Sequence, residues 1–265
     1  MAQPAANHAL SADRQRTTAG MATAATARAP KPTACVIWLH GTGGCGAEFD
    51  ELFAFAQRRH PTPWIRFVCP TASDKPYTLF GGESLAVWFD RDVLGLKCKE
   101  DRKGIAASVA LVDALLEQHA APLGITRERT IVGGFSQGGG LALYTAFGPA
   151  NTKPFAACIT SGAFLPDPSM LIAPHPTAGG NAPTAELPIP APLRSTPLLM
   201  IHGTHDPVVP YINGLSTHDR LSDPERGGLT NTTWIKRERM VHEVDQQAES
   251  AIMQFIQKIL PEKKE

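Results

Sequence analysis

Short apolar runs alternate with segments of helical periodicity from Thr33 onward, and this alternation constrains the fold more than any other feature of the chain. The run at 35–39 is apolar throughout, which is typical of a strand buried on both faces of a sheet. Strands that alternate with helices predict a single α/β domain, with a mostly parallel central sheet and helices on both of its faces. The expected strands are 35–39, 64–69, 130–135, 155–160, 198–201 and 232–235, and the expected helices are 49–56, 105–116, 141–147 and 244–259.

The chain divides into an N-terminal tail and one domain. Residues 1–32 are rich in alanine and threonine and carry three arginines against one acidic residue. This composition predicts a disordered tail, and a mitochondrial targeting peptide is the alternative. Residues 33–265 form the expected domain, in which 72–92 is a long connection and the proline-rich stretch 166–192 is expected to be a loop insertion.

The composition argues against several classes of protein. The 25 basic and 25 acidic side chains cancel, so no net field favours nucleic acid. No apolar run approaches the roughly 18 residues that a transmembrane segment needs. The five cysteines are scattered, with no CxxC pair, which argues against a disulfide scaffold and a cysteine zinc site. A reducing compartment is therefore favoured, and we expect a cytoplasmic protein, with mitochondria as the alternative.

The pentapeptide Gly-Phe-Ser-Gln-Gly at 134–138 places Ser136 between an expected strand and an expected helix. In that context the G-x-S-x-G pattern is typical of a nucleophile elbow, a tight turn that exposes the serine hydroxyl. The backbone amide of Gln137 would then point, with the helix N-terminus, toward a developing oxyanion. The alternative is a glycine-rich turn that carries an uninvolved serine.

A serine hydroxyl needs a base, and after such an elbow the partners follow in the order acid and then histidine. Asp206 comes soon after an expected strand, and His242 lies between another strand and the last helix. Each has an ordinary alternative: Asp206 could close a turn before a proline, and His242 could cap a helix or lie at the surface. The rival residues, none of which follows an expected strand, are Asp219, Asp223 and His218.

The loop after the first strand is expected to supply a second oxyanion donor. Residues 40–44 read His-Gly-Thr-Gly-Gly, and the backbone amide of Thr42 is the candidate. A phosphate-binding loop is the alternative, but the Walker lysine and the GxGxxG spacing are missing. His202, His205 and Asp206 are spaced like metal ligands, but no third cluster of ligands accompanies them. We therefore expect neither a metal nor a cofactor.

Taken together, these stretches resemble the acyl-protein thioesterase and carboxylesterase family of α/β-hydrolases, which includes small lysophospholipases. The matching stretches are 36–43, 86–90, 133–139, 164–166 and 202–210, within a resemblance that covers nearly all of 33–261. The resemblance implies the α/β-hydrolase fold and a catalytic triad of Ser136, Asp206 and His242. It also implies that the backbone amides of Thr42 and Gln137 form the oxyanion hole.

The resemblance further implies that the loop around Trp88 and Phe89 helps to form the acyl-binding surface. A long apolar groove would also need Leu79, Phe80 and Leu85 in its lining, whereas a closed, shallow pocket would favour short esters. The chain departs from the family in its longer stretch 166–192 and in the more charged residues around the histidine. Its first cysteine lies inside an expected strand, and not beside the initiator methionine, where some members carry an acylatable cysteine.

The predicted function is a serine hydrolase that cleaves acyl thioesters of S-acylated proteins through an acyl-enzyme, as in depalmitoylation. The main alternative is a short-chain carboxylesterase or lysophospholipase that acts on small acyl esters or lysophospholipids. A non-catalytic acyl-binding scaffold is the alternative from another class. Transient contact with a membrane surface is compatible with these predictions, and the sequence leaves the acyl chain length and the oligomeric state open.

Overall fold

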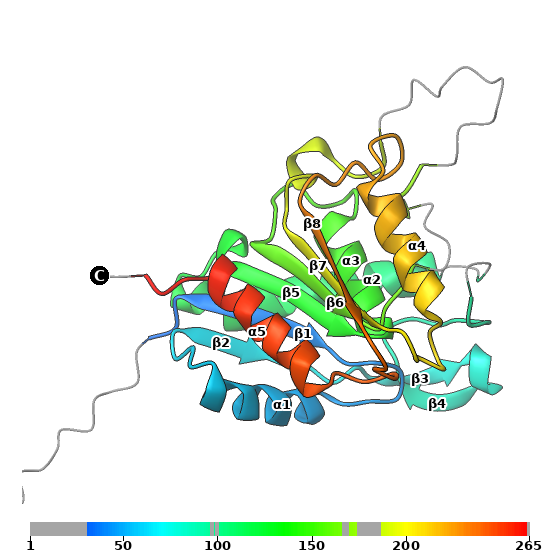
Figure 1. Cartoon of the computed structure of the whole chain (residues 1–265), viewed down its shortest axis with the longest axis horizontal. Helices are drawn as coiled ribbons and strands as arrows, with labels where there is room; N and C mark the ends of the chain where they lie inside the picture. Colours follow the sequence, from blue (N-terminus) through cyan, green and yellow to red (C-terminus); the bar gives the residue numbers. More distant parts are fainter. Residues whose placement is uncertain (1–30, 96–97, 99–100, 166–169, 174–186, 264–265) are drawn as a thin grey trace, which may run out of the picture.

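The computed structural model describes residues 31–95, 98, 101–165, 170–173 and 187–263. Within them, a six-stranded sheet in the order β2-β1-β5-β6-β7-β8 forms the centre, and its neighbouring strands are parallel (Figure 1). The strands of this sheet are β1 (Ala34–Leu39), β2 (Ile65–Val68), β5 (Thr130–Phe135), β6 (Ala157–Ser161), β7 (Leu198–Gly203) and β8 (Thr232–Arg237). The α-helices are α1 (Gly46–Arg59), α2 (Arg102–His119), α3 (Gln137–Phe147), α4 (Tyr211–Ser222) and α5 (Gln246–Ile259).

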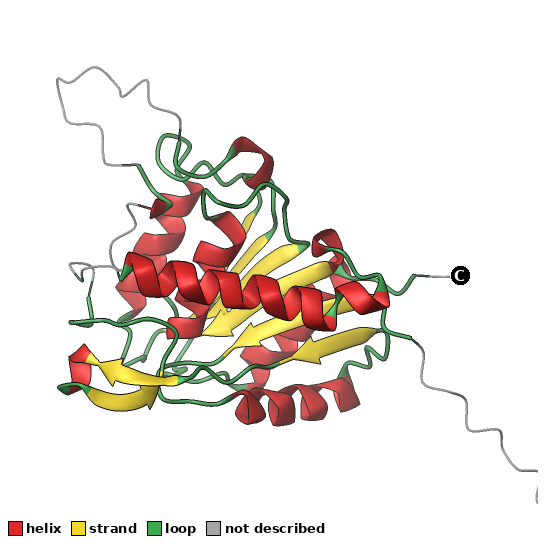
Figure 2. Cartoon of the chain, turned by 180° about the vertical axis from the view of Figure 1, so that it is seen from behind, coloured by secondary structure: helices red, strands yellow, loops and turns green. Residues whose placement is uncertain are grey.

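Helices cover both faces of the sheet, so the molecule has three layers. Helices α1 and α5 lie on the face seen in Figure 1, and α2, α3 and α4 lie on the opposite face, seen in Figure 2. The two faces of β1 belong to two different cores, because alternate residues of a strand point to opposite sides. All six residues of β1 are buried, as expected for 35–39. The predicted α/β fold class is confirmed.

The connection 72–92 contains a small antiparallel hairpin that the sequence did not predict. Its strands are β3 (Asp74–Tyr77) and β4 (Glu83–Ala86), joined by a short 3-10 helix, η1 (Thr78–Phe80), and two glycines. Gly81 and Gly82 have φ angles of 67° and 87°, which favour glycine. The strands escaped prediction because they are short and mostly polar, and one of them contains a proline, Pro76.

Two predicted segments fall largely outside the described residues. Residues 1–30 of the expected tail are among them, as are 166–169 and 174–186 of the expected loop insertion. The described parts of the insertion pack against the main core through Leu171, Ile172 and Ile189. Of the helices that the structure describes, none combines the length and the apolar composition that a bilayer crossing requires.

The parallel arrangement brings the carboxyl ends of the strands to one edge of the sheet. The loops that follow β1, β5, β7 and β8 therefore meet there, as expected for a site in an open parallel sheet. Strands β2 and β8 form the two outer edges of the sheet, and no residue of β8 is buried.

Candidate active site

Ser136 lies at the turn between β5 and α3, with φ 52° and ψ −120°. This backbone conformation is rare for any residue other than glycine and marks local strain. The turn is too tight for side chains on either flank: a Cβ on Gly134 would lie 2.4 Å from a backbone carbon of Gly138. A Cβ on Gly138 would lie 2.2 Å from the carbonyl oxygen of Leu39. The turn therefore has the strained geometry of a nucleophile elbow.

The imidazole of His242 lies between Ser136 and Asp206. Its Nε2 is 3.0 Å from the Ser136 Oγ, and its Nδ1 is 2.7 Å from the Asp206 Oδ2. Because a carboxylate can only accept, Nδ1 carries the proton, which leaves Nε2 free to accept from the serine hydroxyl. The structure thus brings the three predicted residues together in one continuous chain of hydrogen bonds.

Asp206 uses both of its carboxylate oxygens. The Oδ1 atom accepts hydrogen bonds from the amides of Val208 and Val209, at 2.9 and 2.8 Å, while Oδ2 faces His242. Burial raises the pKa of Asp206, but the hydrogen bonds from His242 and from the two amides outweigh it, so the pKa is lowered overall. One carboxylate oxygen therefore closes the turn and the other binds the imidazole. Asp206 is thus both the turn residue before Pro207 and the partner of His242.

The loop after β8 fixes the position of His242. In this loop Arg239 has φ 63°, and its amide donates to the Thr204 Oγ1 at 2.9 Å. A Cβ on Gly203 would lie 2.1 Å from the carbonyl oxygen of Met240, so the loop packs directly on the end of β7. The histidine and the aspartate are thereby carried by neighbouring, closely packed segments.

The backbone amides of Thr42 and Gln137 are available to a ligand. Among the described residues, neither amide has a hydrogen-bond acceptor. The next amide, that of Gly43, donates to the carbonyl oxygen of Ala86 at 2.9 Å, which ties the loop after β1 to the β3–β4 hairpin. Gln137 is the first residue of α3, where the helix dipole favours negative charge.

A cavity of about 190 Å³ opens at Ser136. Its lining includes Ser136 and four other residues that the sequence predicted, Thr42, Leu79, Phe80 and His242. It also includes residues that the sequence analysis did not name. The described lining residues are Gly41, Thr42, Tyr77, Leu79, Phe80, Arg91, Leu94, Phe135, Ser136, Val208 and His242. The sequence signal for Arg91 was its place directly after the matching stretch 86–90.

Trp88 and Phe89 require a correction, because the structure places them behind the cavity. They are 1% and 3% exposed, respectively, and neither belongs to the described lining. The indole Nε1 of Trp88 donates to the carbonyl oxygen of His40 at 2.8 Å. The Gln137 side chain accepts from the Trp88 amide and donates to the Phe89 carbonyl oxygen, both at 2.9 Å. The two aromatic residues therefore support the elbow from behind the cavity wall.

His202, one of the residues considered for a metal site, is buried beside the aspartate. Its Nε2 lies 2.9 Å from the carbonyl oxygen of Val209 and 3.5 Å from the Asp206 Oδ2. Burial lowers the pKa of His202. His205 points elsewhere, toward the Thr204 hydroxyl. In the part of the chain that the structure describes, no group of three or more metal-ligating side chains comes together.

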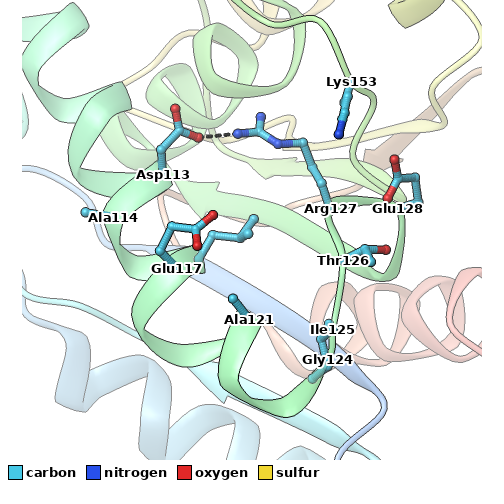
Figure 3. A pocket seen from close by; sticks show the side chains of 11 residues that line it. Asp113, Ala114, Glu117, Ala121, Gly124, Ile125, Thr126, Arg127, Glu128 and Lys153 are labelled. Carbon is cyan, nitrogen blue, oxygen red and sulfur yellow. Dashed lines mark hydrogen bonds and ion pairs between the residues drawn. The ribbon is translucent and has the colours of Figure 1, made fainter.

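A larger cavity, of about 680 Å³, lies near the amino ends of β5 and β6, away from the strand ends that carry Ser136 and Asp206 (Figure 3). Helix α2 and the segment before β5 form its walls, and Asp113 pairs there with Arg127. Glu117, Glu128 and Lys153 also line it, but no paired nucleophile and base do. The chemistry therefore points to the smaller cavity at Ser136.

Comparison with known proteins gives a consistent result. The model of the phospholipase/carboxylesterase family matches residues 22–260. The chain is 31% identical to acyl-protein thioesterase 1 homolog 1 of Dictyostelium discoideum over 229 residues, which cover 86% of this chain and 92% of that protein.

Two solved structures are similar to most of the chain. Acyl-protein thioesterase 2 of Zea mays superposes with a TM-score of 0.70 and 28% identity, over 87% of this chain and 95% of that one. An Arabidopsis thaliana SOBER1 variant superposes with a TM-score of 0.72 over 86% of this chain and 99% of that one. At 21% identity, the similarity to SOBER1 shows a shared fold alone.

Proposed function

The chain belongs to the phospholipase/carboxylesterase family of α/β-hydrolases and is an ester or thioester hydrolase, and we propose that it removes acyl groups from S-acylated proteins through an acyl-enzyme on Ser136. The hydrogen-bonded chain from the Ser136 Oγ through His242 to Asp206 carries this proposal. The names of the relatives support the choice of a thioester substrate.

In the proposed cycle, Ser136 attacks the acyl carbonyl carbon while His242 takes the hydroxyl proton at Nε2. Asp206 holds the imidazole in the tautomer with its proton on Nδ1 and stabilises the imidazolium that forms. The carbonyl oxygen becomes negatively charged, and the amides of Thr42 and Gln137 stabilise it, each by about 3 kcal/mol in the transition state.

The carbon–sulfur bond breaks, the imidazolium of His242 gives its Nε2 proton to the departing sulfur, and the thiol leaves while the acyl group stays on Ser136. His242 then accepts a proton from water, the hydroxide attacks the acyl carbon, and the carboxylic acid is released as the serine recovers its proton. A thiolate needs less help from a proton than an alkoxide does, so thioesters are easier substrates than esters, and amides are the hardest.

The size of the cavity favours a second candidate, a short-chain carboxylesterase. Its volume of about 190 Å³ lies below the range of about 300–1,000 Å³ that is usual for ligand pockets. A long chain would therefore have to extend beyond the cavity, past exposed residues at its mouth such as Phe80 and Leu94.

A series of acyl chains from C2 to C16, offered as paired aryl esters and thioesters and as acylated peptides, tests these candidates. The thioesterase proposal expects a higher kcat/KM for thioesters than for matched esters, and release of acyl groups from peptides. A steep fall beyond C4 together with inert acyl-peptides would refute it and leave the short-chain carboxylesterase. Turnover of lysophospholipids in place of both would identify a lysophospholipase.

A non-catalytic acyl-binding scaffold is the candidate from another class. The strained backbone of Ser136 argues against it, because binding alone does not require such a conformation. Covalent labelling with a fluorophosphonate probe distinguishes the two classes. We expect labelling of the wild type and none of Ser136→Ala, and an unlabelled wild type would favour the scaffold.

A further inference from the structure

Arg91 brings a positive charge to the wall of the cavity at Ser136. The residue is only 5% exposed, yet it belongs to the lining. The other described residues of this wall are apolar or neutral apart from His242, and none of them is a carboxylate. A charge in a small cleft with low-dielectric walls produces a strong local field.

The structure holds Arg91 in a fixed orientation. Its guanidinium carbon lies 5.4 Å from the ring centre of Phe89 and 4.9 Å from that of Phe164. Its amide donates to the Asp90 Oδ1 and its carbonyl oxygen accepts from the Leu79 amide, both at 2.8 Å. A group fixed in this way loses little conformational entropy when it binds a ligand.

Burying the guanidinium of Arg91 costs desolvation free energy, and a neutral side chain of similar volume would fill the wall at a lower cost. Arg91 also interacts with other groups of the protein. Its five N–H donors allow it to keep such contacts and still offer donors to the cavity. Its charge reaches the wall residue Tyr77: burial raises the pKa of Tyr77, a hydrogen bond with Thr42 and the charge of Arg91 oppose that rise, and Cys98 and the charge of Asp90 each add less to it than Arg91 removes.

We propose that Arg91 binds an anionic group of the substrate, so that the enzyme favours acyl esters and thioesters with a carboxylate or phosphate near the cleaved bond. This inference rests on the proposed function and names the substrate class of the same site. Because the cavity is only about 190 Å³, the anionic group must lie within a few bonds of the reacting carbonyl. It arrives either at the end of a short acyl chain, as in the monothioester of a dicarboxylic acid, or on the leaving alcohol or thiol.

Matched thioesters distinguish these two sources of charge. In the acyl arm, butyryl and succinyl thioesters of N-acetylcysteamine have equal acyl lengths and differ in the terminal carboxylate. In the leaving-group arm, butyryl thioesters of 3-mercaptopropionamide and 3-mercaptopropionate differ in the same way. In one of these two comparisons, the one whose charged group reaches Arg91, we expect the wild type to favour the charged substrate by about tenfold to a hundredfold in kcat/KM. The gain should come mainly from a lower KM.

Three variants relate this preference to the guanidinium. Arg91→Met removes the charge and keeps much of the side-chain length, so the charged-to-neutral ratio of kcat/KM should fall to one or below. Arg91→Lys keeps a charge without the planar fork and should retain part of the preference. Arg58→Met is the control: this exposed arginine lies 5.8 Å from the Phe55 ring on α1, outside the described lining. We expect it to keep the wild-type ratio.

Two results would overturn the inference: a wild type with no preference in either arm, or an Arg91→Met variant that keeps the preference. In both cases neutral thioesters would still be turned over, so the proposed function would stand. If no thioester is cleaved and no fluorophosphonate label appears, both proposals fail. If Arg91→Met does not fold, competitive inhibition of the wild type decides: stronger inhibition by succinate than by butyramide supports the inference, and equal inhibition overturns it.

Discussion

Replacing Asp206 with asparagine is expected to stop turnover while the protein stays folded. The Oδ1 of asparagine can still accept from the amides of Val208 and Val209. At the position of Oδ2, however, the side-chain amide donates a proton where the carboxylate accepted one. His242 must then present an unprotonated Nδ1, which moves its proton to Nε2, facing Ser136. In that tautomer the imidazole cannot remove the serine proton.

The expected loss in kcat is about ten-thousandfold, as found when a triad aspartate becomes asparagine. At about 1.36 kcal/mol for each factor of ten, this equals about 5.4 kcal/mol of activation free energy. The free energy of unfolding should fall by only about 1.5–3 kcal/mol at pH 7, because one hydrogen bond to a charged group is lost. Asp206→Ala should cost about 1–3 kcal/mol more for the buried Val209 amide left unpaired, and less for the amide of the exposed residue Val208.

The stability difference between wild type and Asp206→Asn should also depend on pH. The folded pKa of Asp206 is lowered, so its stabilising effect is fully present above the unfolded pKa of about 4. That effect is lost as the pH falls through the folded pKa. The two proteins should therefore converge in stability in acid.

Initial rates with an aryl ester, normalised by fluorophosphonate labelling of the wild type, measure kcat, and urea denaturation measures stability. Asp219→Asn is the matched control, because its side chain is 65% exposed and lies on α4, away from the hydrogen-bonded chain. We expect wild-type activity from it. A folded Asp206→Asn protein with a kcat within about tenfold of wild type would refute the tautomer argument.

Three further predictions concern the surroundings of the site. Gln137→Leu leaves the Trp88 amide and the Phe89 carbonyl without their partner, so urea denaturation should show a loss of about 2–6 kcal/mol, and an unchanged midpoint would contradict it. Gly214→Ala would place a Cβ 2.2 Å from the His202 Nδ1, so it should destabilise by about 1–3 kcal/mol, opposite to the gain usual in a helix. Because burial lowers the pKa of His202, wild-type stability should fall as the pH drops below about 6.5, and denaturation of His202→Asn across pH should give a flatter profile.

The sheet and the three residues of the hydrogen-bonded chain were predictable for the same reason. The inner strands β1, β5, β6 and β7 are buried on both faces and are largely apolar, and the residues that follow the carboxyl ends of parallel strands must meet on one side of the sheet. Asp206 and His242 could be chosen over Asp219 and His218 because only the former follow strands.

Features that depend on distant contacts were not predictable. The aromatic residues Trp88 and Phe89 fit a core and a cavity wall equally well, and only the hydrogen bonds with Gln137 and His40 decide between them. Arg91 reads as an ordinary surface arginine, because one of the rings that enclose it, that of Phe164, lies far along the chain.

The edge position of β8 is expected to limit how long the enzyme keeps its activity on mild heating. This strand pairs with β7 on one side, carries no buried residue, and leads into the loop that holds His242. Strands of this kind fray at a lower free energy than central ones such as β5. On heating, His242 is therefore expected to leave its place beside Ser136 before the central strands unfold, so activity should be lost before the core melts.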